Sequence, residues 1–303
     1  MKVSVVVLNY NGWKDTLECI ESLKRCRKHF KEIEIIVVDN NSTDNSQSHL
    51  AKLTEVSLVL NKENFGYSGG NNVGIKYALN KKCDYVLIIN NDTYVDELLL
   101  KNIFKNSQAD GILSPKIYFA PGFEFHKDRY SKPDLGKVIW YAGGRIDWSN
   151  IIGMHIGVDE VDTGQFNDKK EIDFATGACM LVKKEVFEKI GMFDERYFLY
   201  LEDMDFCVRA KKAGFRITFS PQAKLWHKNA ATSGGSGSLL QDYYITRNRL
   251  LFAFKFAKLR TKLAVLKQAI LKANNPTKRL ALIDFLTYKL GRSSKSLDRK
   301  SVV

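Results

Sequence analysis

The 303-residue sequence lacks the long apolar runs of membrane-spanning helices, because no uninterrupted stretch approaches the roughly 18–20 residues that cross a bilayer. Its five cysteines are scattered without a C-x-x-C pair, which indicates a reducing compartment and neither a disulfide framework nor a zinc site. The opening MKVSVVVLNYNG has no small-residue cleavage site, so we expect a β-strand there and not a signal peptide. With 45% hydrophobic and 27% charged residues, the composition excludes a disordered chain.

Common nucleotide-binding signatures are also missing. The tetrapeptide NYNG at residues 9–12 stands where a nicotinamide dehydrogenase would carry G-x-G-x-x-G. No G-x-x-x-x-G-K-[ST] of a P-loop NTPase occurs either. A sugar-phosphate nucleotidyltransferase would normally show a Gly-rich, basic loop near the N-terminus. None is visible, although this class stays an alternative.

The net charge of +13 is confined to the C-terminal fifth of the chain. Residues 243–303 contain 15 Lys and Arg and two Asp, whereas residues 1–242 contain 32 basic and 32 acidic residues. A neutral body with a basic tail is a weak pattern for nucleic-acid binding, and we expect no nucleic acid partner. Residues 250–271 place apolar residues between Lys and Arg at helical spacing. We expect an amphipathic helix that either binds an anionic membrane or packs on the body or on a second subunit.

Short β-branched runs alternate with helix-like stretches over the first hundred residues. The runs 3–8, 33–38, 56–60 and 85–89 are nearly continuous in apolar residues, as expected of parallel strands buried on both faces. This alternation predicts βαβ units, and therefore an α/β fold with a Rossmann-like, mostly parallel sheet flanked by helices. The pattern returns over residues 173–220 as strand, helix, connector, helix and strand.

A polar cluster follows each of the four runs. In chain order the clusters read NYNG, DNNSTD, NFGYSGGNN and NNDT. Each cluster alone can be turn chemistry, since Asn, Asp and Gly dominate turns. Because ligands of parallel sheets bind at the carboxyl ends of the strands, four clusters in succession predict a polar ligand site. The Gly pair at 69–70 lets backbone N–H groups approach a phosphate or a sugar.

Carboxylates occur at two places in the sequence that suit metal binding or general-base catalysis. Asp92 closes the NND triplet and can hold a hard divalent cation, or can serve as a turn residue. Glu202, Asp203 and Asp205 lie among aromatic residues, where crowding and partial burial would raise a carboxyl pKa toward that of a general base. The alternative is an acidic first helical turn that complements the helix dipole.

Three further polar residues stand later in the chain. His227 follows a strand-like run and precedes the Gly/Ser segment 228–238, which we expect to be mobile. A lone histidine is usually structural, but this place between strand and loop favours a functional role. Arg247 and Asn248 can reach a phosphate from a helix, or can belong to ordinary helix surface.

Taken together, these segments resemble a family 2 glycosyltransferase. The resemblance covers about residues 1–250 and rests on the ordered segments VVVLNYNG, VVDNNSTD, NFGYSGGNN, INND, TGACMLVKKEVFEKIGMFDE, FLYLEDMDFCVRAKKAG and W-H. The nearest branch contains rhamnosyltransferase-like enzymes of bacterial surface polysaccharide synthesis. The resemblance implies a GT-A fold, a nucleotide-sugar donor, a divalent metal (Mn²⁺ or Mg²⁺) and inversion at the anomeric carbon.

The resemblance also implies an organisation and a partner set. We expect a glycosyltransferase domain over residues 1–240, with a nucleotide-sugar-binding half at 1–92 and an acceptor-side half at 93–240. The basic helical region would then span 241–303. The donor would be dTDP-rhamnose or a UDP-sugar, and the acceptor a hydroxyl of a saccharide or lipid-linked saccharide. We expect a cytoplasmic protein, peripheral on the inner face of the membrane. The non-enzymatic alternative is a nucleotide-sugar-binding protein without turnover.

Residue roles follow by position from the resemblance. Asp39 matches the residue that recognises the base, Asp203 the catalytic base, and Asp92 and His227 the metal or diphosphate ligands. The other donor-binding positions are Leu8, Asn9, Tyr10, Asn41, Gly70 and Asn91. Asn90 replaces the first Asp of the D-x-D motif, so it can coordinate through its carbonyl but brings no charge, and we expect weaker metal binding. Further contacts are expected from Asn90, Glu202, Arg247 and Asn248.

Overall fold

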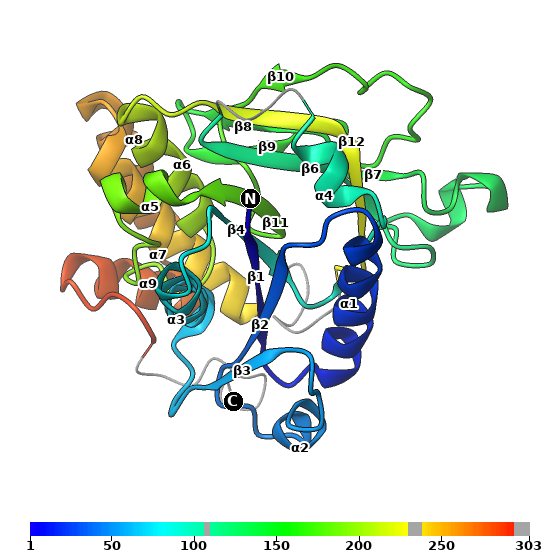
Figure 1. Ribbon diagram of the computed structural model, residues 1–303. Coiled ribbons are helices and arrows are strands. Elements are labelled where there is room, and N and C mark those ends of the chain that lie inside the picture. Colours follow the sequence, from blue (N-terminus) through cyan, green and yellow to red (C-terminus); the bar gives the residue numbers. More distant parts are fainter. Residues whose placement is uncertain (106–109, 230–237, 294–303) are drawn as a thin grey trace.

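The computed structural model describes residues 1–105, 110–229 and 238–293 (Figure 1). Most of the segment expected to be mobile, residues 230–237, lies outside this range. The strands are β1 (Val3–Asn9), β2 (Ile33–Asp39), β3 (Ser57–Leu60), β4 (Tyr85–Asn90), β5 (Thr93–Val95), β6 (Ile112–Phe119), β7 (Ile139–Tyr141), β8 (Gly144–Asp147), β9 (Ile152–His155), β10 (Lys170–Glu171), β11 (Cys179–Lys183) and β12 (Ile217–His227). The helices are α1 (Trp13–Arg25), α2 (Ser46–Leu50), α3 (Gly66–Asn80), α4 (Leu99–Ile103), α5 (Lys184–Ile190), α6 (Glu202–Lys212), α7 (Leu239–Phe256), α8 (Leu259–Leu271) and α9 (Pro276–Leu286), with short 3₁₀ turns at Cys26–Lys28, Lys127–Arg129 and Lys132–Asp134.

The N-terminal half forms the parallel part of the sheet. β1 pairs in parallel with β2 and β4, and β2 pairs in parallel with β3. Nearly all side chains of β1, β2 and β4 are buried, as the continuous apolar runs predicted. The register places Asn9 opposite Asp39 and Leu8 opposite Asn90. The polar ends of three strands therefore meet at one edge of the sheet.

The second half of the sheet is mixed. The strand order is β10-β12-β6-β11-β4-β1-β2-β3. β11 is antiparallel to both β4 and β6, and β12 is parallel to β6 but antiparallel to β5 and β10. The α/β expectation is confirmed, while parallel pairing dominates only up to β4. A run of apolar residues predicts that a strand is buried on both faces but does not predict its direction. The antiparallel orientation of β11 could therefore not be predicted from the sequence.

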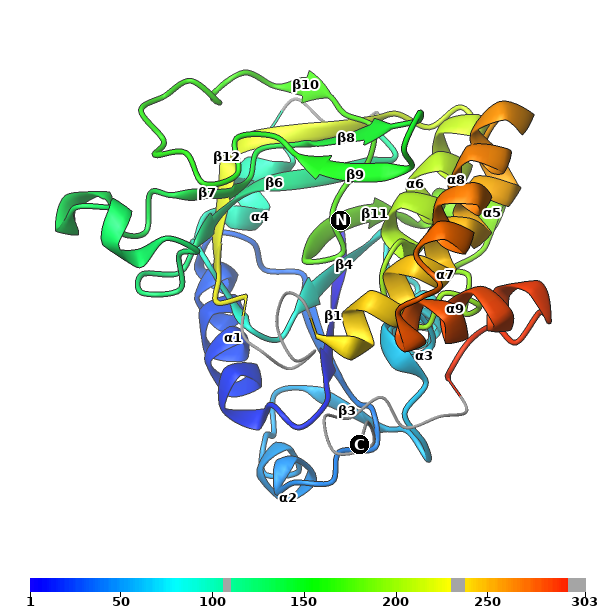
Figure 2. The same ribbon diagram turned by 180° about the vertical axis from the view of Figure 1, so that it is seen from behind.

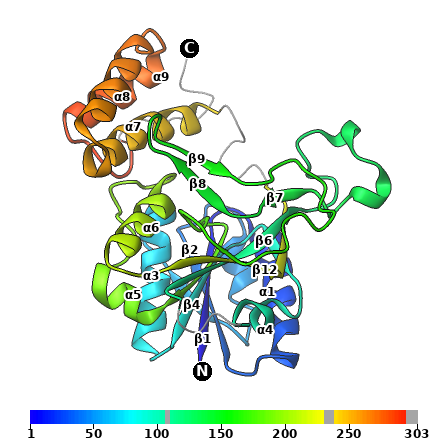
Figure 3. The same ribbon diagram turned by 90° about the horizontal axis from the view of Figure 1, so that it is seen from above.

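Helices cover both faces of the sheet. Figures 1 and 3 show α1 and α4 on one side and α3, α5 and α6 on the other. Helix α3 approaches β1 and β2 closely at Gly74. A Cβ there would lie 2.4 Å from Val6 Cγ1 and 3.0 Å from Val38 Cγ2. The missing side chain thus sets how close α3 comes to β1 and β2.

The C-terminal helices form a layer of their own. Figures 2 and 3 show α7 beside the body and α8 and α9 farther out. The expected single helix over 250–271 is wrong, because Ala257 is extended (φ −81°, ψ 160°) and separates α7 from α8. Leu250 to Ala253 of α7 are buried in the core, whereas α8 buries only Val265 and Ala269. The apolar face of α7 therefore packs on the body, which was one of the alternatives expected for residues 250–271.

The five cysteines are free thiols and are all buried. Among the helices of the described segments, none has both the length and the apolar character needed to cross a bilayer.

Gly74→Ala should destabilise the fold. The added methyl group has no space against Val6 and Val38, and overpacking of this kind costs about 1–3 kcal/mol in the free energy of unfolding. Urea denaturation followed by circular dichroism measures the change. Lys76→Ala, at an exposed position of the same helix, is the control and should leave the midpoint nearly unchanged. Equal midpoints for the two variants would show that α3 can move away from the sheet at little cost.

Candidate active site

Asp39 lies fully buried at the end of β2 and is surrounded by donors. Its carboxylate accepts hydrogen bonds from Asn9 Nδ2 (2.7 Å), Ser42 Oγ (2.6 Å), Ser42 N (3.1 Å) and Gln47 Nε2 (3.1 Å). Two carboxylate oxygens offer about four acceptor sites, so these donors use all of them. Asp39 thereby fixes the loop after β2, and a further donor can reach it only by replacing one of the four.

Leu8 and Gly70 come together from β1 and α3. A Cβ at position 70 would lie 2.6 Å from Leu8 Cδ1, so only glycine permits this approach. Tyr10 and Asn41 are exposed at the same edge, and Asn41 has a left-handed backbone (φ 62°). The structure thus gathers these predicted donor-binding positions around the ends of β1 and β2.

Two asparagines lock the neighbouring loops. Asn91 donates to Thr16 Oγ1 (3.0 Å), and Thr16 donates in turn to Asn9 Oδ1 (2.8 Å), which ties the loop after β4 to α1 and β1. Asn40, which sequence reasoning did not single out, is buried and donates to Gly66 O (3.0 Å). It also accepts from Phe65 N (3.1 Å) and so holds the turn that begins α3. Its only sequence signal was membership of a polar cluster.

Asp92 and His227 form a close pair, although they lie 135 positions apart. His227 Nε2 stands 3.1 Å from Asp92 Oδ1, and both residues are buried. The pairing of β5 with β12 places them together, because it sets His227 opposite Thr93. Lys228 N also donates to Asp92 O (2.9 Å). The two predicted metal ligands therefore converge.

The chemistry of this pair fits a divalent cation. Asp92 offers a carboxylate oxygen and His227 an imidazole nitrogen 3.1 Å away, and groups of these two types would hold a divalent cation. His227 Nδ1 is buried and finds no hydrogen-bond partner within the described part of the chain, while the ring packs edge-on against Trp140 at 4.6 Å. No cluster of three or more His, Cys, Asp or Glu side chains suited to a metal occurs in the described ranges.

Asp203 lies in the first turn of α6 and has its carboxylate fixed by the backbone. It accepts hydrogen bonds from Gly177 N (2.9 Å) and Met204 N (2.7 Å). Burial raises the pKa of Asp203, and these N–H groups oppose the rise. Burial and then the charge of Asp203 raise the pKa of Glu202 well above its ordinary value. Of this acidic turn, Asp205 is committed elsewhere, to Tyr197 Oη (3.0 Å) and Arg209 Nε (2.6 Å).

The segment 176–178 lies between Asp203 and the end of β4. Gly177 N holds Asp203, while the carbonyl of the next residue, Ala178, accepts from Asn90 N (3.0 Å). Tyr67 of α3 donates to Gly177 O (2.5 Å). The loop that carries Asn90 and the carboxylate of Asp203 therefore flank one short segment. Tyr67 and Gly177 stood within recognised motifs, but nothing in the sequence marked them individually.

Arg247 and Asn248 are not placed to reach a phosphate. Both side chains are fully buried, and every guanidinium nitrogen of Arg247 donates to a protein oxygen. Asn248 Nδ2 donates to the carbonyls of Tyr197 (2.8 Å), Leu199 (2.7 Å) and Tyr200 (2.9 Å). The expected phosphate contact is therefore corrected: these two residues bind the backbone before α6. A polar pair on a helix does not reveal in sequence whether its partners are ligand or main chain.

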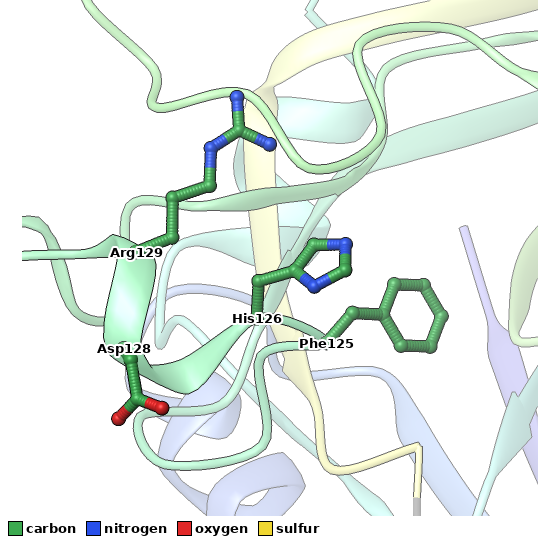
Figure 4. Close-up of a pocket in the computed structure, with 4 residues that line it drawn as sticks. All are labelled: Phe125, His126, Asp128 and Arg129. Atoms are coloured by element: carbon green, nitrogen blue, oxygen red, sulfur yellow. The ribbon is translucent and has the colours of Figure 1, made fainter.

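A separate open pocket lies on the long loop after β6. Phe125, His126, Asp128 and Arg129 line it, and Figure 4 shows the rings of Phe125 and His126 near each other, with the Asp128 carboxylate pointing away from them. Arg129 is paired with Asp159 (2.9 Å). The loop begins beside the Asp92–His227 pair, because Ala120 N donates to His227 O (2.9 Å). The pocket is thus an outer neighbour of the site and not its centre.

The sequence is similar to known sugar transferases. It is 25% identical over 252 residues to a hexosyltransferase of low-salt glycan biosynthesis from Haloferax volcanii, covering 82% of this chain and 74% of that protein. It is 26% identical over 263 residues to a dTDP-rhamnosyl transferase from Shigella flexneri, covering 84% and 80%. An N-acetylglucosaminyl-diphospho-decaprenol L-rhamnosyltransferase from Mycobacterium tuberculosis is 26% identical over 224 residues, covering 67% and 69%.

The fold is similar to solved transferase structures. The mannosyltransferase PcManGT from Pyrobaculum calidifontis, in complex with GDP-Man and Mn²⁺, superposes with a TM-score of 0.56 at 15% identity, over 95% of this chain and 80% of that one. GalNAc-T7 with UDP, GalNAc and Mn²⁺ gives 0.59 at 16% identity, over 82% and 51%. These likenesses show the GT-A fold. The profile of the family described as Glycosyl transferase family 2 matches residues 4–191, and the chain belongs to that family.

Proposed function

We propose that this glycosyltransferase inverts the anomeric centre, with Asp203 as the general base and Asp92 and His227 as the metal ligands. The observation that supports the proposal is the contact set around segment 176–178. Gly177 N holds the Asp203 carboxylate, whose pKa burial raises, and Ala178 O accepts from Asn90 N, two residues before the Asp92 that pairs with His227. An inverting transfer needs one base, on the acceptor side, and stabilisation of the departing diphosphate on the other.

In the proposed reaction the oxygen of an acceptor hydroxyl attacks the anomeric carbon. Its proton passes to the carboxylate of Asp203, which Gly177 N and Met204 N hold in place. The bond between the anomeric carbon and the diphosphate breaks, and the nucleoside diphosphate leaves with the electron pair. When bound, a divalent cation supplies charge that stabilises this leaving group. A nucleophile on the opposite face of the sugar is not required.

The nucleoside would occupy the edge formed by Leu8, Asn9, Tyr10, Asn41 and Gly70, beside Asn91. We propose that Asp39 recognises the base after Gln47 withdraws, because thymine and uracil both present an N–H donor that can take its place. The similarity to the dTDP-rhamnosyl transferase of Shigella flexneri supports dTDP-rhamnose as the donor of this protein, and UDP-sugars are the alternative. Screening nucleotide sugars for thermal protection, with and without Mn²⁺, and then for product separates a transferase from a protein that only binds its ligand.

Asp203→Asn should abolish transfer while leaving donor binding nearly intact. The amide has a similar size but cannot take a proton, and loss of a general base costs about 100- to 10,000-fold in rate. The measurement is kcat with saturating donor, together with the dissociation constant of the nucleoside diphosphate. The isosteric control is Glu188→Gln, at an exposed position of α5. Near-normal turnover by Asp203→Asn would exclude Asp203 as the base.

Asp92→Ala should weaken donor binding and its dependence on Mn²⁺. The diphosphate loses its bridge to the protein, and KM for the donor should rise about tenfold or more. His227→Ala should act in the same direction but more mildly. A second readout is the thermal protection by UDP with Mn²⁺, and His29→Ala is a histidine control outside the site. Full activity of the unaltered protein in excess chelator would contradict the metal role.

We also propose that α8 docks on an anionic membrane surface, where a lipid-linked acceptor would lie on the cytoplasmic side. Leu259, Leu263 and Ile270 fall on one helical stripe and are 71%, 57% and 56% exposed. Exposed cations flank the stripe on the same helix and its ends, namely Lys258, Arg260, Lys267 and Lys272. Such a helix can bury its stripe at the headgroup boundary, and each cation near anionic lipid contributes about 1 kcal/mol.

The triple variant Leu259→Ser, Leu263→Ser, Ile270→Ser should lose flotation with vesicles that contain phosphatidylglycerol. Each change removes apolar area from the stripe without touching the site. Ile152→Ser with Met154→Ser, also exposed apolar positions, is the control. Activity on a soluble acceptor analogue should stay unchanged in both variants. Equal flotation of the triple variant, the control and the unaltered protein would contradict docking by α8.

A further inference from the structure

The backbone directly before Asp203 has an unusual conformation. Phe198, Tyr200 and Leu201 all have positive φ angles, of 61°, 71° and 70°. A side chain with a Cβ disfavours this left-handed region, and bulky residues are rarely found there. Leu201 is the residue on which α6 begins, so its conformation sets the direction in which the helix and Asp203 leave the loop.

Side chains of α7 hold this loop from one side. Asn248 Nδ2 donates to three of its carbonyls, and Arg247 Nη2 donates to the carbonyls of Arg196 (3.0 Å) and Tyr197 (3.1 Å). The two side chains also bind each other, since Arg247 Nε donates to Asn248 Oδ1 (3.0 Å). Lys255, two turns later, pairs with Asp194 (2.7 Å) and with Asp205 of α6. One helix thus binds the loop along most of its length.

Helix α3 holds the loop from the other side. Tyr67 N (2.7 Å) and Ser68 N (3.3 Å) donate to Phe198 O, and Asn72 exchanges hydrogen bonds with Phe193 (2.9 and 3.0 Å). Gly66 leaves space for this contact, because a Cβ there would lie 2.5 Å from Phe198 O. Tyr67 is also the residue that binds Gly177, the donor to Asp203. The loop therefore joins the donor-side helix, the base and α7.

We propose that Asn248 and Arg247 are positioning residues for Asp203. They supply the donors that satisfy the carbonyls of loop 196–200 in its left-handed form, and this form places the Asp203 carboxylate against Gly177 N. The proposal rests on the proposed role of Asp203 as the base. It gives these two residues of the first helix of the basic C-terminal region a part in positioning the base, while the other residues of that helix, α8 and α9 have no such part.

A generic packing role would not need these particular groups. Asn248 spends both amide hydrogens and its oxygen on polar partners in a fully buried place, where an apolar residue would pack without such requirements. Apart from one bond of Arg247 Nη1 to Gly291 O (2.7 Å), the main-chain partners of the two side chains are four carbonyls within residues 196–200. This arrangement fixes a backbone path, and a displacement of about 1 Å in a reacting group can lower a rate about 100-fold.

The test is Asn248→Ala in the full-length chain. We expect kcat to fall about 10- to 100-fold, with the dissociation constant of the nucleoside diphosphate changed less than about threefold. The control is Ile245→Ala, an exposed position one turn earlier on α7, which should keep kcat. If Asn248→Ala does not fold, Asn248→Ser keeps one donor and is read by the same criteria.

Two readouts separate positioning from mere stability. In an Asp203→Asn background, Asn248→Ala should cause little additional loss, because a group acting through Asp203 has nothing left to act on. The acid limb of the pH–rate profile should move to higher pH, since a carboxylate that loses the Gly177 N–H bond is harder to ionise. The other titratable groups that act on Asp203 or are acted on by it are Glu202, Tyr67, Tyr141 and Cys207, and none of them changes in the variant.

Unchanged kcat in Asn248→Ala, or the same fold-loss in both backgrounds, would overturn the proposal. Retained turnover by Asp203→Asn alone would instead overturn the role of Asp203, so the two failures are distinguishable.

Discussion

The site depends on one constraint: three residues with large side chains must stay in left-handed conformations immediately before α6. Phe198, Tyr200 and Leu201 each bear a penalty of about 1–2 kcal/mol in this region of backbone space. In this conformation the carbonyls of the loop are buried, and leaving them without hydrogen bonds would cost further free energy. Asn248 and the backbone N–H groups of α3 supply the donors that they need. Helices α3 and α7, which are distant in sequence, therefore both bind residues 193–200, and these residues link the sheet, the acidic turn of α6 and the C-terminal helices.

Much of the N-terminal half could be predicted from the sequence. Runs such as 3–8 and 33–38 are apolar on both faces, and the polar residues that follow them mark where each strand ends. The second half could not be predicted at this level. The direction of β11 depends on the connection through residues 93–178, whose short strands and turns carry no clear period. The break between α7 and α8 could not be predicted either, because both Ala257 and Lys258 favour the helical conformation.

Motif position in the sequence picked out two side chains that the fold brings into contact. Asp92 and His227 were named from motif positions, and the pairing of β5 with β12 brings them into contact. Arg247 and Asn248 were named with the wrong partner. A buried main chain in an unusual conformation demands the same donors as a phosphate does, and only the conformation of residues 198–201 reveals that demand. Gly177 gave no signal because it acts through its backbone N–H and carbonyl, which every residue except proline has. Tyr67 gave none because its hydroxyl binds that backbone carbonyl, a partner that the sequence does not identify.

The pairing of β5 with β12 also has a consequence for biosynthesis. His227 reaches Asp92 only after the chain has passed through β6 and β11, which lie between β4 and β12 in the sheet, and the contact closes a loop of 135 positions. Long-range pairings of this kind form late in folding, since the entropy of loop closure must be met before the contact is gained. A nascent chain on the ribosome can therefore build the edge of β1, β2 and β4, which we propose for the nucleoside, well before it can assemble the Asp–His pair. Sugar-nucleotide recognition and the capacity for turnover would be acquired at different moments of synthesis.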